Sequence, residues 1–382
     1  MMRSVWVEPS WRLPQFVGEL VQHPPEGYNF LARKSGRRSG GALQGHLLRK
    51  LQEGVSRVVP LQLLMSQSRG LMRHQENLTY ALTHVVLRSQ PWVLDMITEQ
   101  PHLLISPYSG VTRYANIVRR ALLSEACKGI LCWCRASRNA LLQRFGGDLA
   151  DKTKTIYWGV PVKRFTKEYN EKTVKLLFIN SANINTGQHF FAKGGLEVLH
   201  AFVRLRKKYS NLELTIRSGM PEDLRVVCNA IPGVRVYHEL MPQTALEQEW
   251  RSANIFVLPN RYNTPAMSFL EAMSYELPIV TTEIWANPEL VKDGETGFTV
   301  SHPYTRQYNA CDPALPWSKI PTTVPYETTV GDLVRRLELL IENHSWGLEM
   351  GKKARRMVES GQFSTEKRNE RLKRFLDSAV SG

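Results

Sequence analysis

Apolar residues in the C-terminal half of the chain fall into short runs that alternate with longer segments of helical spacing. Residues 174–179 form a β-rich run, residues 194–209 follow at near-helical spacing, and residues 212–216 return to a strand pattern. The same rhythm continues through predicted helices at 221–231, 244–253 and 267–276 and predicted strands at 234–240, 255–258 and 279–282. This alternation predicts a parallel, doubly wound sheet, and such sheets bind ligands beyond the carboxyl ends of their strands.

The N-terminal half shows a weaker version of the same pattern. Strands are predicted at 27–33, 55–65 and 128–134, strand ends at 83–87 and 91–94, and helices at 42–52 and 114–126. A second α/β layer therefore precedes the first, and the change occurs near residues 156–161. From Trp346 onward the pattern predicts one long basic helical stretch. The predicted divisions of the chain are residues 1–158, 159–345 and 346–382.

The composition is that of a globular protein with a basic excess. Of 382 residues, 42% are hydrophobic, and 50 Lys and Arg stand against 35 Asp and Glu, a net charge of +15. Residues 1–158 hold 21 basic and 10 acidic residues, a net of +11, whereas residues 159–382 hold 29 and 25, a net of +4. Such a field attracts polyanions or an anionic membrane face, and a solvated basic surface without a partner is the other interpretation.

Several classes of protein are disfavoured by the sequence. No uninterrupted apolar run reaches the roughly 18 residues that cross a bilayer, and the first residues lack the pattern of a secretory signal. The five cysteines form no C-x2-C pair, which disfavours a zinc site and a disulfide framework and favours reduced thiols in a cytoplasm. The basic residues are not interleaved with an aromatic platform, so nucleic acid is not an expected partner. We expect a cytoplasmic protein, with peripheral attachment to the inner face of a membrane as an open alternative.

The segment 255–282 carries the clearest candidate chemistry. A strand ends, a polar stretch follows, and a helix is predicted to begin near Ala266. The free backbone N–H groups of Ala266, Met267 and Ser268 would favour an anion such as a diphosphate at the sheet edge. Glu271 lies deeper in the same helix, where its carboxylate can accept hydrogen bonds from the two hydroxyl groups of a ribose.

These residues make the chain resemble the retaining glycosyltransferase group 1 family (family 4). That family has two glutamates separated by seven residues, the second followed by Ala-Met and then by a strand that begins Pro-Ile-Val. Here the pattern is Asn263, seven residues, Glu271-Ala-Met and Pro278-Ile-Val. Further segments that resemble family motifs stand in the expected order at 155–160, 193–202 and 288–298.

The resemblance implies a GT-B fold, with two Rossmann-like doubly wound parallel-sheet domains and a cleft between them. It also implies a nucleotide-diphosphate sugar as the donor substrate and no separate cofactor. Glu271 would hold the nucleotide ribose, Lys193 and the helix N-terminus would face the diphosphate, and Asn263 stands where the family has a glutamate near the transferred sugar. The structural alternatives are a solvated Lys193, an exposed Glu271, and an Asn263 that only forms an Asx turn before a proline.

Two further departures from the family concern the diphosphate. The Gly-Arg pair that the family places shortly before Lys193 is replaced by residues 180–187, and Arg217 and Arg261 are the candidate substitutes. No Asp-x-Asp motif follows a predicted strand, so we expect no metal ion to hold the diphosphate.

The sequence thus predicts a metal-independent retaining glycosyltransferase of the hexosyltransferase type, active in polysaccharide biosynthesis. It would move a sugar from a nucleotide-diphosphate donor to a hydroxyl group of a glycolipid or polysaccharide acceptor. Asp95 and His84, near the ends of N-terminal strands, are candidates to orient the acceptor or the sugar, and a structural role for either is equally open. The alternative function is that of a non-transferase on the same fold, either a nucleotide-sugar epimerase or a catalytically silent binder, because Asn263 replaces a glutamate.

Overall fold

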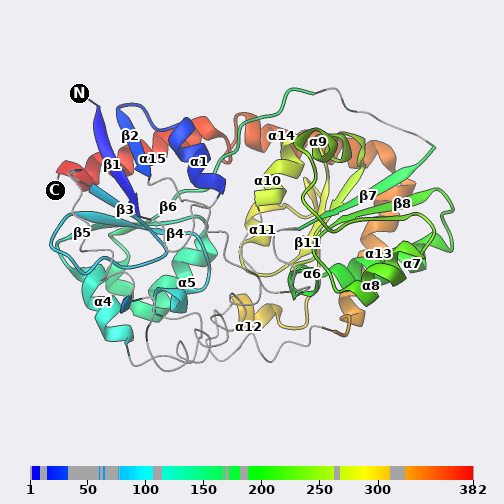
Figure 1. The fold of residues 1–382 in the computed structure, drawn as a ribbon, viewed down its shortest axis with the longest axis horizontal. Helices are drawn as coiled ribbons and strands as arrows, with labels where there is room; N and C mark the ends of the chain where they lie inside the picture. The colour runs from blue at the N-terminus through cyan, green and yellow to red at the C-terminus, as the bar shows by residue number, and fades with distance from the viewer. Residues whose placement is uncertain are drawn as a thin grey trace. The chain divides into compact units, whose positions relative to one another are not determined.

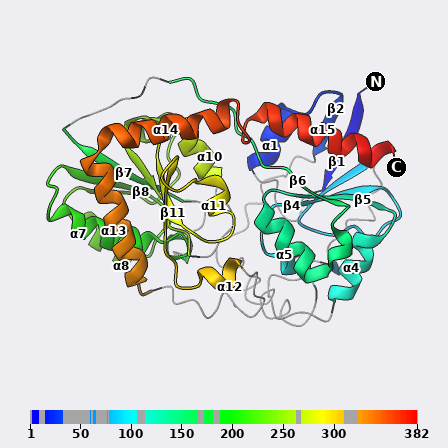
Figure 2. The ribbon, with the colours of Figure 1, turned by 180° about the vertical axis from the view of Figure 1, so that it is seen from behind.

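The chain folds into two compact units. The computed structural model describes residues 2–8, 15–32, 60, 63–64, 76, 78–105, 114–165, 167, 172–180, 188–261, 267–309 and 323–381. Of these, unit 1 contains the residues up to Trp158 and from Thr365 onward, and unit 2 contains those from Gly159 to Ser364. Each unit is built around one parallel sheet, and helices cover both faces of that sheet (Figures 1 and 2).

Unit 1 has six parallel strands in the order β2-β1-β3-β4-β5-β6. The strands are β1 Arg3–Glu8, β2 Tyr28–Ala32, β3 Leu78–Leu82, β4 Trp92–Met96, β5 Cys127–Cys132 and β6 Thr153–Thr155. The helices are α1 Gln15–Gln22, α4 Ala115–Leu123, α5 Arg135–Phe145 and α15 Thr365–Ser381, with short 3-10 helices at Pro101–Leu104 and Gly147–Leu149. Helices α1 and α15 lie on one face of the sheet, and α4 and α5 lie on the other (Figure 1).

Unit 2 also has six parallel strands, in the order β12-β11-β10-β7-β8-β9. They are β7 Val174–Ile179, β8 Leu212–Arg217, β9 Val234–Tyr237, β10 Ile255–Val257, β11 Ile279–Thr282 and β12 Gly297–Val300. The helices are α6 Gln188–Ala192, α7 Gly195–Arg206, α8 Glu222–Asn229, α9 Gln243–Ser252, α10 Met267–Ser274, α11 Asn287–Leu290, α12 Thr305–Asn309, α13 Glu327–Glu342 and α14 His344–Glu359. Helices α9, α10 and α14 cover one face of the sheet, and α7, α8 and α13 cover the other (Figures 1 and 2).

The predicted α/β architecture with two doubly wound parallel sheets is confirmed. Its physical basis is that strands covered by helices on both faces are buried throughout, so they read as continuous apolar runs. Every residue of β10 and of β11 is buried, for example. The long connections between consecutive parallel strands are the helices that supply this cover.

Four sequence-based expectations about elements differ from the structure, and the helix expected at 42–52 lies outside the described residues. In the strand expected at 55–65, Leu63 and Leu64 are helical, and most of the other residues lie outside the described ranges. The first strand, β1, was not predicted, because its apolar residues alternate with a charge at each end. The strand end expected at 83–87 is wrong: β3 ends at Leu82, and Thr83 leaves the β region with a φ of 52°. The single helical stretch expected from Trp346 onward is two helices, since α14 ends at Glu359 and belongs to unit 2, while α15 belongs to unit 1.

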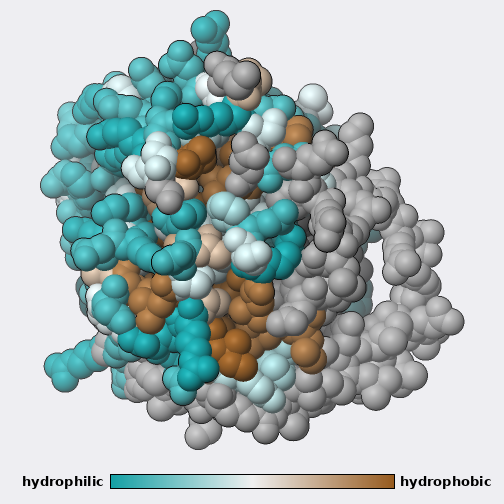
Figure 3. All heavy atoms as spheres, turned by 90° about the vertical axis from the view of Figure 1, so that its left-hand side faces the viewer, coloured by the Kyte–Doolittle hydropathy of each residue, from teal (hydrophilic) through white to brown (hydrophobic). Residues whose placement is uncertain are grey.

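The surface of the described residues is mainly polar. Figure 3 shows one face on which hydrophilic side chains dominate and apolar areas are enclosed between them. Within the described ranges, no helix combines the length and the apolar character that a membrane-spanning segment requires.

Candidate functional site

The carboxyl edge of the unit 2 sheet gathers the predicted site residues of that unit. Because all six strands run parallel, the segments that follow β7, β8 and β10 all leave the sheet at this edge. Asn180 follows β7, Arg217 is the last residue of β8, and the segment 258–261 follows β10 and precedes α10. The site is therefore built from strand ends that are held by the core, not from one continuous loop.

Lys193 occupies a tight turn between α6 and α7. Gly194, the next residue, has a φ of 75°, a left-handed conformation that glycine adopts without steric cost. A β-carbon at this position would lie 2.1 Å from the carbonyl oxygen of Pro259, so only glycine permits the close approach. The backbone N–H of Arg261 donates to the carbonyl of Ala192 at 2.9 Å. These contacts hold the turn of Lys193 against residues 259–261, which follow β10 and are called its exit below. Lys193 is only 7% exposed.

The same exit leads to α10, the helix that carries Met267, Ser268 and Glu271. The apolar residues Phe269 and Leu270 are buried, and the ring of Phe269 packs edge-on against Phe256 of β10 at 6.2 Å. Met267 and Ser268 lie in the first turn and are partly exposed, and this turn contains no acidic side chain. Its backbone N–H groups have no acceptors within the helix, which favours a bound anion. Asn263 and Ala266 lie outside the described residues.

Glu271 is a partly buried carboxyl on the second turn of α10. Burial raises its pKa, and the positive charges of Lys163 and Arg217 oppose this rise. Within the described ranges, no hydrogen bond or ion pair engages the carboxylate. Glu271 therefore keeps its acceptor capacity for a ligand.

The two arginines considered as substitute cations differ in their surroundings. Arg261 is fully buried and pairs with Glu197 of α7 at 2.6 Å. Its guanidinium also donates to the carbonyl of Val324 at 2.8 Å and lies 4.6 Å from the ring centre of Tyr326. Arg261 is thus occupied by structural contacts. Arg217 is only partly buried and lies within the electrostatic reach of Glu271.

Asp95 belongs to unit 1 and is completely buried at the carboxyl end of β4. The hydroxyl of Tyr80 on β3 donates to its Oδ2 at 2.9 Å. Burial raises the pKa of Asp95 from 3.8 to about 7, while the hydrogen bond from Tyr80 and the proximity of the Trp133 indole partly oppose the rise. The structure thus places Asp95 in the core of its own sheet, among aromatic side chains.

His84 lies in a buried polar cluster with Glu8 and Arg88. Its Nδ1 is 3.0 Å from the carbonyl of Leu82, and its Nε2 is 3.6 Å from the Oε1 of Glu8 at the end of β1. Arg88 donates to the other oxygen of Glu8 at 2.6 Å. Glu8 was missed because β1 was not predicted; a carboxylate directly after an apolar strand pattern is the signal that would have found it.

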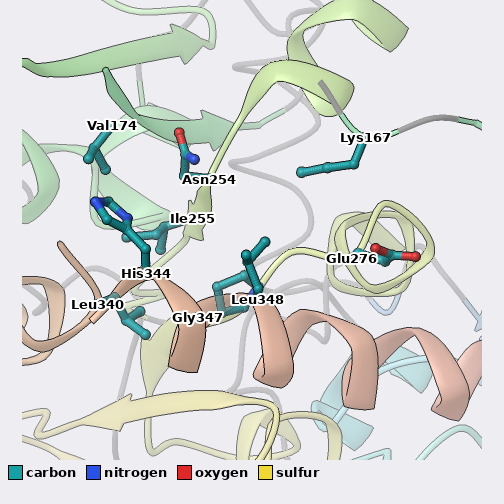
Figure 4. A pocket seen from close by; sticks show the side chains of 10 residues that line it. Lys167, Val174, Asn254, Ile255, Glu276, Leu340, His344, Gly347 and Leu348 are labelled. Carbon is teal, nitrogen blue, oxygen red and sulfur yellow. The ribbon is translucent and has the colours of Figure 1, made fainter. Parts of the chain in front are cut away.

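A separate small pocket opens at the opposite, amino edge of the unit 2 sheet (Figure 4). It is lined by the starts of β7, β10 and β11 and by α14, with Lys167 and Glu276 as its charged groups. Burial lowers the pKa of Lys167 to about 7, against the attraction of Glu276, and the ammonium group donates to the carbonyl of Tyr275 at 3.3 Å. The predicted nucleotide-binding residues lie at the other edge, so this pocket belongs to none of them.

The comparisons with known proteins concern the family and the fold of the chain. Residues 182–308 match the protein family described as "Glycosyl transferases group 1". The alpha-maltose-1-phosphate synthase of Mycolicibacterium smegmatis is 24% identical over 254 residues, which cover 61% of this chain. The chain matches 62% of the length of that relative. The predicted resemblance to the group 1 family is therefore confirmed.

Two solved structures cover nearly all of the chain. HepE of Anabaena, solved in complex with UDP and glucose, superimposes with a TM-score of 0.61 and 13% identity, over 99% of this chain and 100% of its own. Sucrose-phosphate synthase of Thermosynechococcus elongatus gives a TM-score of 0.64 with 12% identity over 100% of both chains. At these identities the likeness shows the fold, and the predicted GT-B fold is confirmed.

Proposed function

We propose that this chain, whose residues 182–308 match the group 1 glycosyltransferases, transfers a sugar from a nucleotide-diphosphate donor to a hydroxyl group of an acceptor. The observation that carries the proposal is the packing of the Lys193 turn against the exit of β10, which leads directly into the helix of Glu271. This arrangement supports the proposal, in which Lys193 and the N-terminus of α10 would bind the diphosphate and Glu271 would bind the ribose. The match to the family and the crystallised complexes of HepE with UDP support a nucleotide sugar, with UDP as the first candidate.

In the proposed reaction, the hydroxyl oxygen of the acceptor bonds to the anomeric carbon while the bond from that carbon to the diphosphate oxygen breaks. Lys193 and the N-terminus of α10 stabilise the negative charge that develops on the leaving diphosphate. The departing phosphate oxygen takes the proton of the acceptor, so the sugar is transferred on one face without a covalent enzyme intermediate. Retention and independence of a metal ion are parts of this proposal. Retention rests on the family resemblance, and independence of a metal ion rests on the sequence, in which no Asp-x-Asp motif follows a predicted strand.

The acceptor is proposed to be a glycolipid or a polysaccharide. This choice is supported by the basic excess of residues 1–158, which would also attract the anionic face of a membrane. A nucleotide-sugar epimerase or a catalytically silent binder has less support, because the relatives named above include two synthases.

The test combines turnover with binding. The purified chain is incubated with UDP-glucose, ADP-glucose and GDP-glucose, and release of free nucleotide is measured, while calorimetry records the affinity for each diphosphate and its nucleoside. We expect turnover of at least one donor. In Lys193→Ala, the affinity for the diphosphate should fall much more than the affinity for the nucleoside. Lys207→Ala, which removes an exposed lysine at the other end of α7, should change neither. Binding without any release of nucleotide would favour the silent alternative, and absence of both would refute the proposed function.

A further inference from the structure

Arg217 differs from the other cations near the carboxyl edge of the unit 2 sheet. Arg261 is held by the buried carboxylate of Glu197, and the ammonium of Lys163 lies 3.9 Å from Glu247. The guanidinium of Arg217 is held by a single hydrogen bond, to a backbone carbonyl, within the described residues. A guanidinium has five N–H donors in a rigid plane, so the described residues use only a minority of the donors of Arg217.

The backbone determines where this guanidinium lies. Arg217 is directly opposite Ile179 in the β7–β8 pairing, and the N–H of Asn180 donates to the carbonyl of Arg217 at 2.8 Å. In return, the Nη1 of Arg217 donates to the carbonyl of Asn180 at 2.8 Å. The side chain therefore folds from the end of β8 over the end of β7, which is the strand between β8 and β10. The buried Nε of Arg217 finds no hydrogen-bond partner in the described part of the chain.

Glu271 lies on the other side of this strand end, on the helix that follows β10. The charges of Arg217 and Glu271 affect each other's pKa, so the two groups are close enough to attract, yet they form no ion pair in the part of the chain that the structure describes. Burial opposes the charge on both groups, so leaving the two charges without a bound partner is unfavourable. A ligand that offers hydroxyl donors to the carboxylate and anionic oxygens to the guanidinium would satisfy both.

We propose that Arg217 binds the phosphate oxygens of the same nucleotide whose ribose is held by Glu271. This inference rests on the proposed function and adds a residue to it. The planar guanidinium matches two oxygens of one phosphate group, and hydrogen bonds between two charged groups are stronger than neutral ones. In a nucleotide, the phosphate is joined to the ribose, so the two groups would be recognised on either side of the end of β7. The structural alternative is that Arg217 only covers the end of β7.

The experiment measures binding by calorimetry for Arg217→Gln, Arg217→Lys and the unsubstituted chain. The ligands are whichever of UDP, ADP and GDP the unsubstituted chain binds most tightly, the corresponding monophosphate, and the nucleoside. Arg206→Gln is the matched control, because Arg206 also donates to backbone carbonyls, those of Pro232 and Tyr209, beside the amino ends of β8 and β9. Thermal melting without ligand shows whether each variant is folded.

In Arg217→Gln we expect the affinity for the diphosphate and the monophosphate to fall at least about tenfold, while the affinity for the nucleoside stays nearly unchanged. Arg217→Lys should be intermediate, since it keeps the charge but loses the planar pair of donors. An unchanged affinity for the diphosphate, or an equal loss for the nucleoside, would overturn the role of Arg217 and leave the proposed function standing. If the unsubstituted chain binds none of the three diphosphates, the proposed function fails and the role of Arg217 fails with it.

Discussion

Replacing Asp95 by asparagine tests whether this carboxyl is a core group of unit 1 or a group that acts on substrate. Asp95 is completely buried, one of its oxygens accepts from the hydroxyl of Tyr80, and the other has no hydrogen-bond partner among the described residues. Asparagine has nearly the same shape and keeps an oxygen for Tyr80, but it cannot ionise. The substitution therefore removes the charge and leaves the packing in place.

The expected magnitude follows from the raised pKa. Since the pKa of Asp95 is 3.8 in an unfolded chain and about 7 in the fold, the folded state keeps a proton that the unfolded state releases. Its contribution to stability is fully present below pH 3.8 and is lost as the pH rises to about 7. A difference of roughly 3 pKa units corresponds to about 4 kcal/mol in all, of which roughly 3 kcal/mol is lost between about pH 5 and pH 8.

The assay is urea unfolding of the wild type and Asp95→Asn at several values between about pH 5 and pH 8, followed by tryptophan fluorescence. The free energy of unfolding of the variant, relative to the wild type, should increase by roughly 3 kcal/mol across this range, because only the wild type must bury an ionised carboxylate. Asp148→Asn, a substitution at an exposed aspartate of the same unit, should show little change with pH. A difference for Asp95→Asn that does not depend on pH would refute the reasoning. A stable variant without turnover would instead support the catalytic role predicted from the sequence.

Two further substitutions test the unit 2 site. Glu271→Gln should weaken the binding of nucleosides as well as nucleotides. In the wild type alone, the affinity should fall with decreasing pH, because burial raises the pKa of Glu271 and its protonated form is a poorer acceptor. Equal pH profiles of the affinity in the wild type and the variant would contradict this. Gly194→Ala should lower both the melting temperature and the affinity for UDP, since its β-carbon would meet the carbonyl of Pro259 and its φ is 75°. Gly331→Ala on α13, where nothing lies closer than 3.9 Å, should be neutral or stabilising, and a similar loss there would refute the contact argument.

The sequence predicted the fold of unit 2 better than that of unit 1 for a physical reason. In unit 2, β10 is apolar throughout and β7 is interrupted only by Lys175, so both runs are easy to recognise. In β1 of unit 1, charged residues stand at both ends of the strand and leave only a short run of apolar residues. The end of β3 depends on the left-handed backbone of Thr83, which no periodicity reveals.

For the candidate site, motifs located the residues but could not show their partners. Lys193 and Glu271 were found because each belongs to a local pattern of the sequence. Which arginine is available for a ligand depends on Glu197, whose carboxylate binds Arg261 although 64 positions separate the two residues in the chain. Such a pairing is created by tertiary packing, so Arg217 and Arg261 were equivalent in the sequence and are different in the structure.

The pairing of Glu197 with Arg261 also explains how the site keeps its shape. A buried ion pair contributes little net stability, because removing two charges from water costs about as much as their attraction returns. Its effect here is on position: Glu197 lies in the first turn of α7, and Arg261 lies in the exit of β10. Together with the contact between Gly194 and Pro259, it ties the turn of Lys193 to the segment that enters α10.

The residues that make these contacts are different from the residues that would touch a ligand. The departures from the family pattern, Asn263 and residues 180–187, are substitutions of side chains expected to face the donor. The contacts described above join the Lys193 turn and α7 to residues 259–261, and they are made by other residues. A change of donor affinity or donor choice is therefore compatible with an intact scaffold at the edge proposed to bind the nucleotide. A cation from the neighbouring strand β8 can replace one from the segment after β7, because both strand ends meet at that edge.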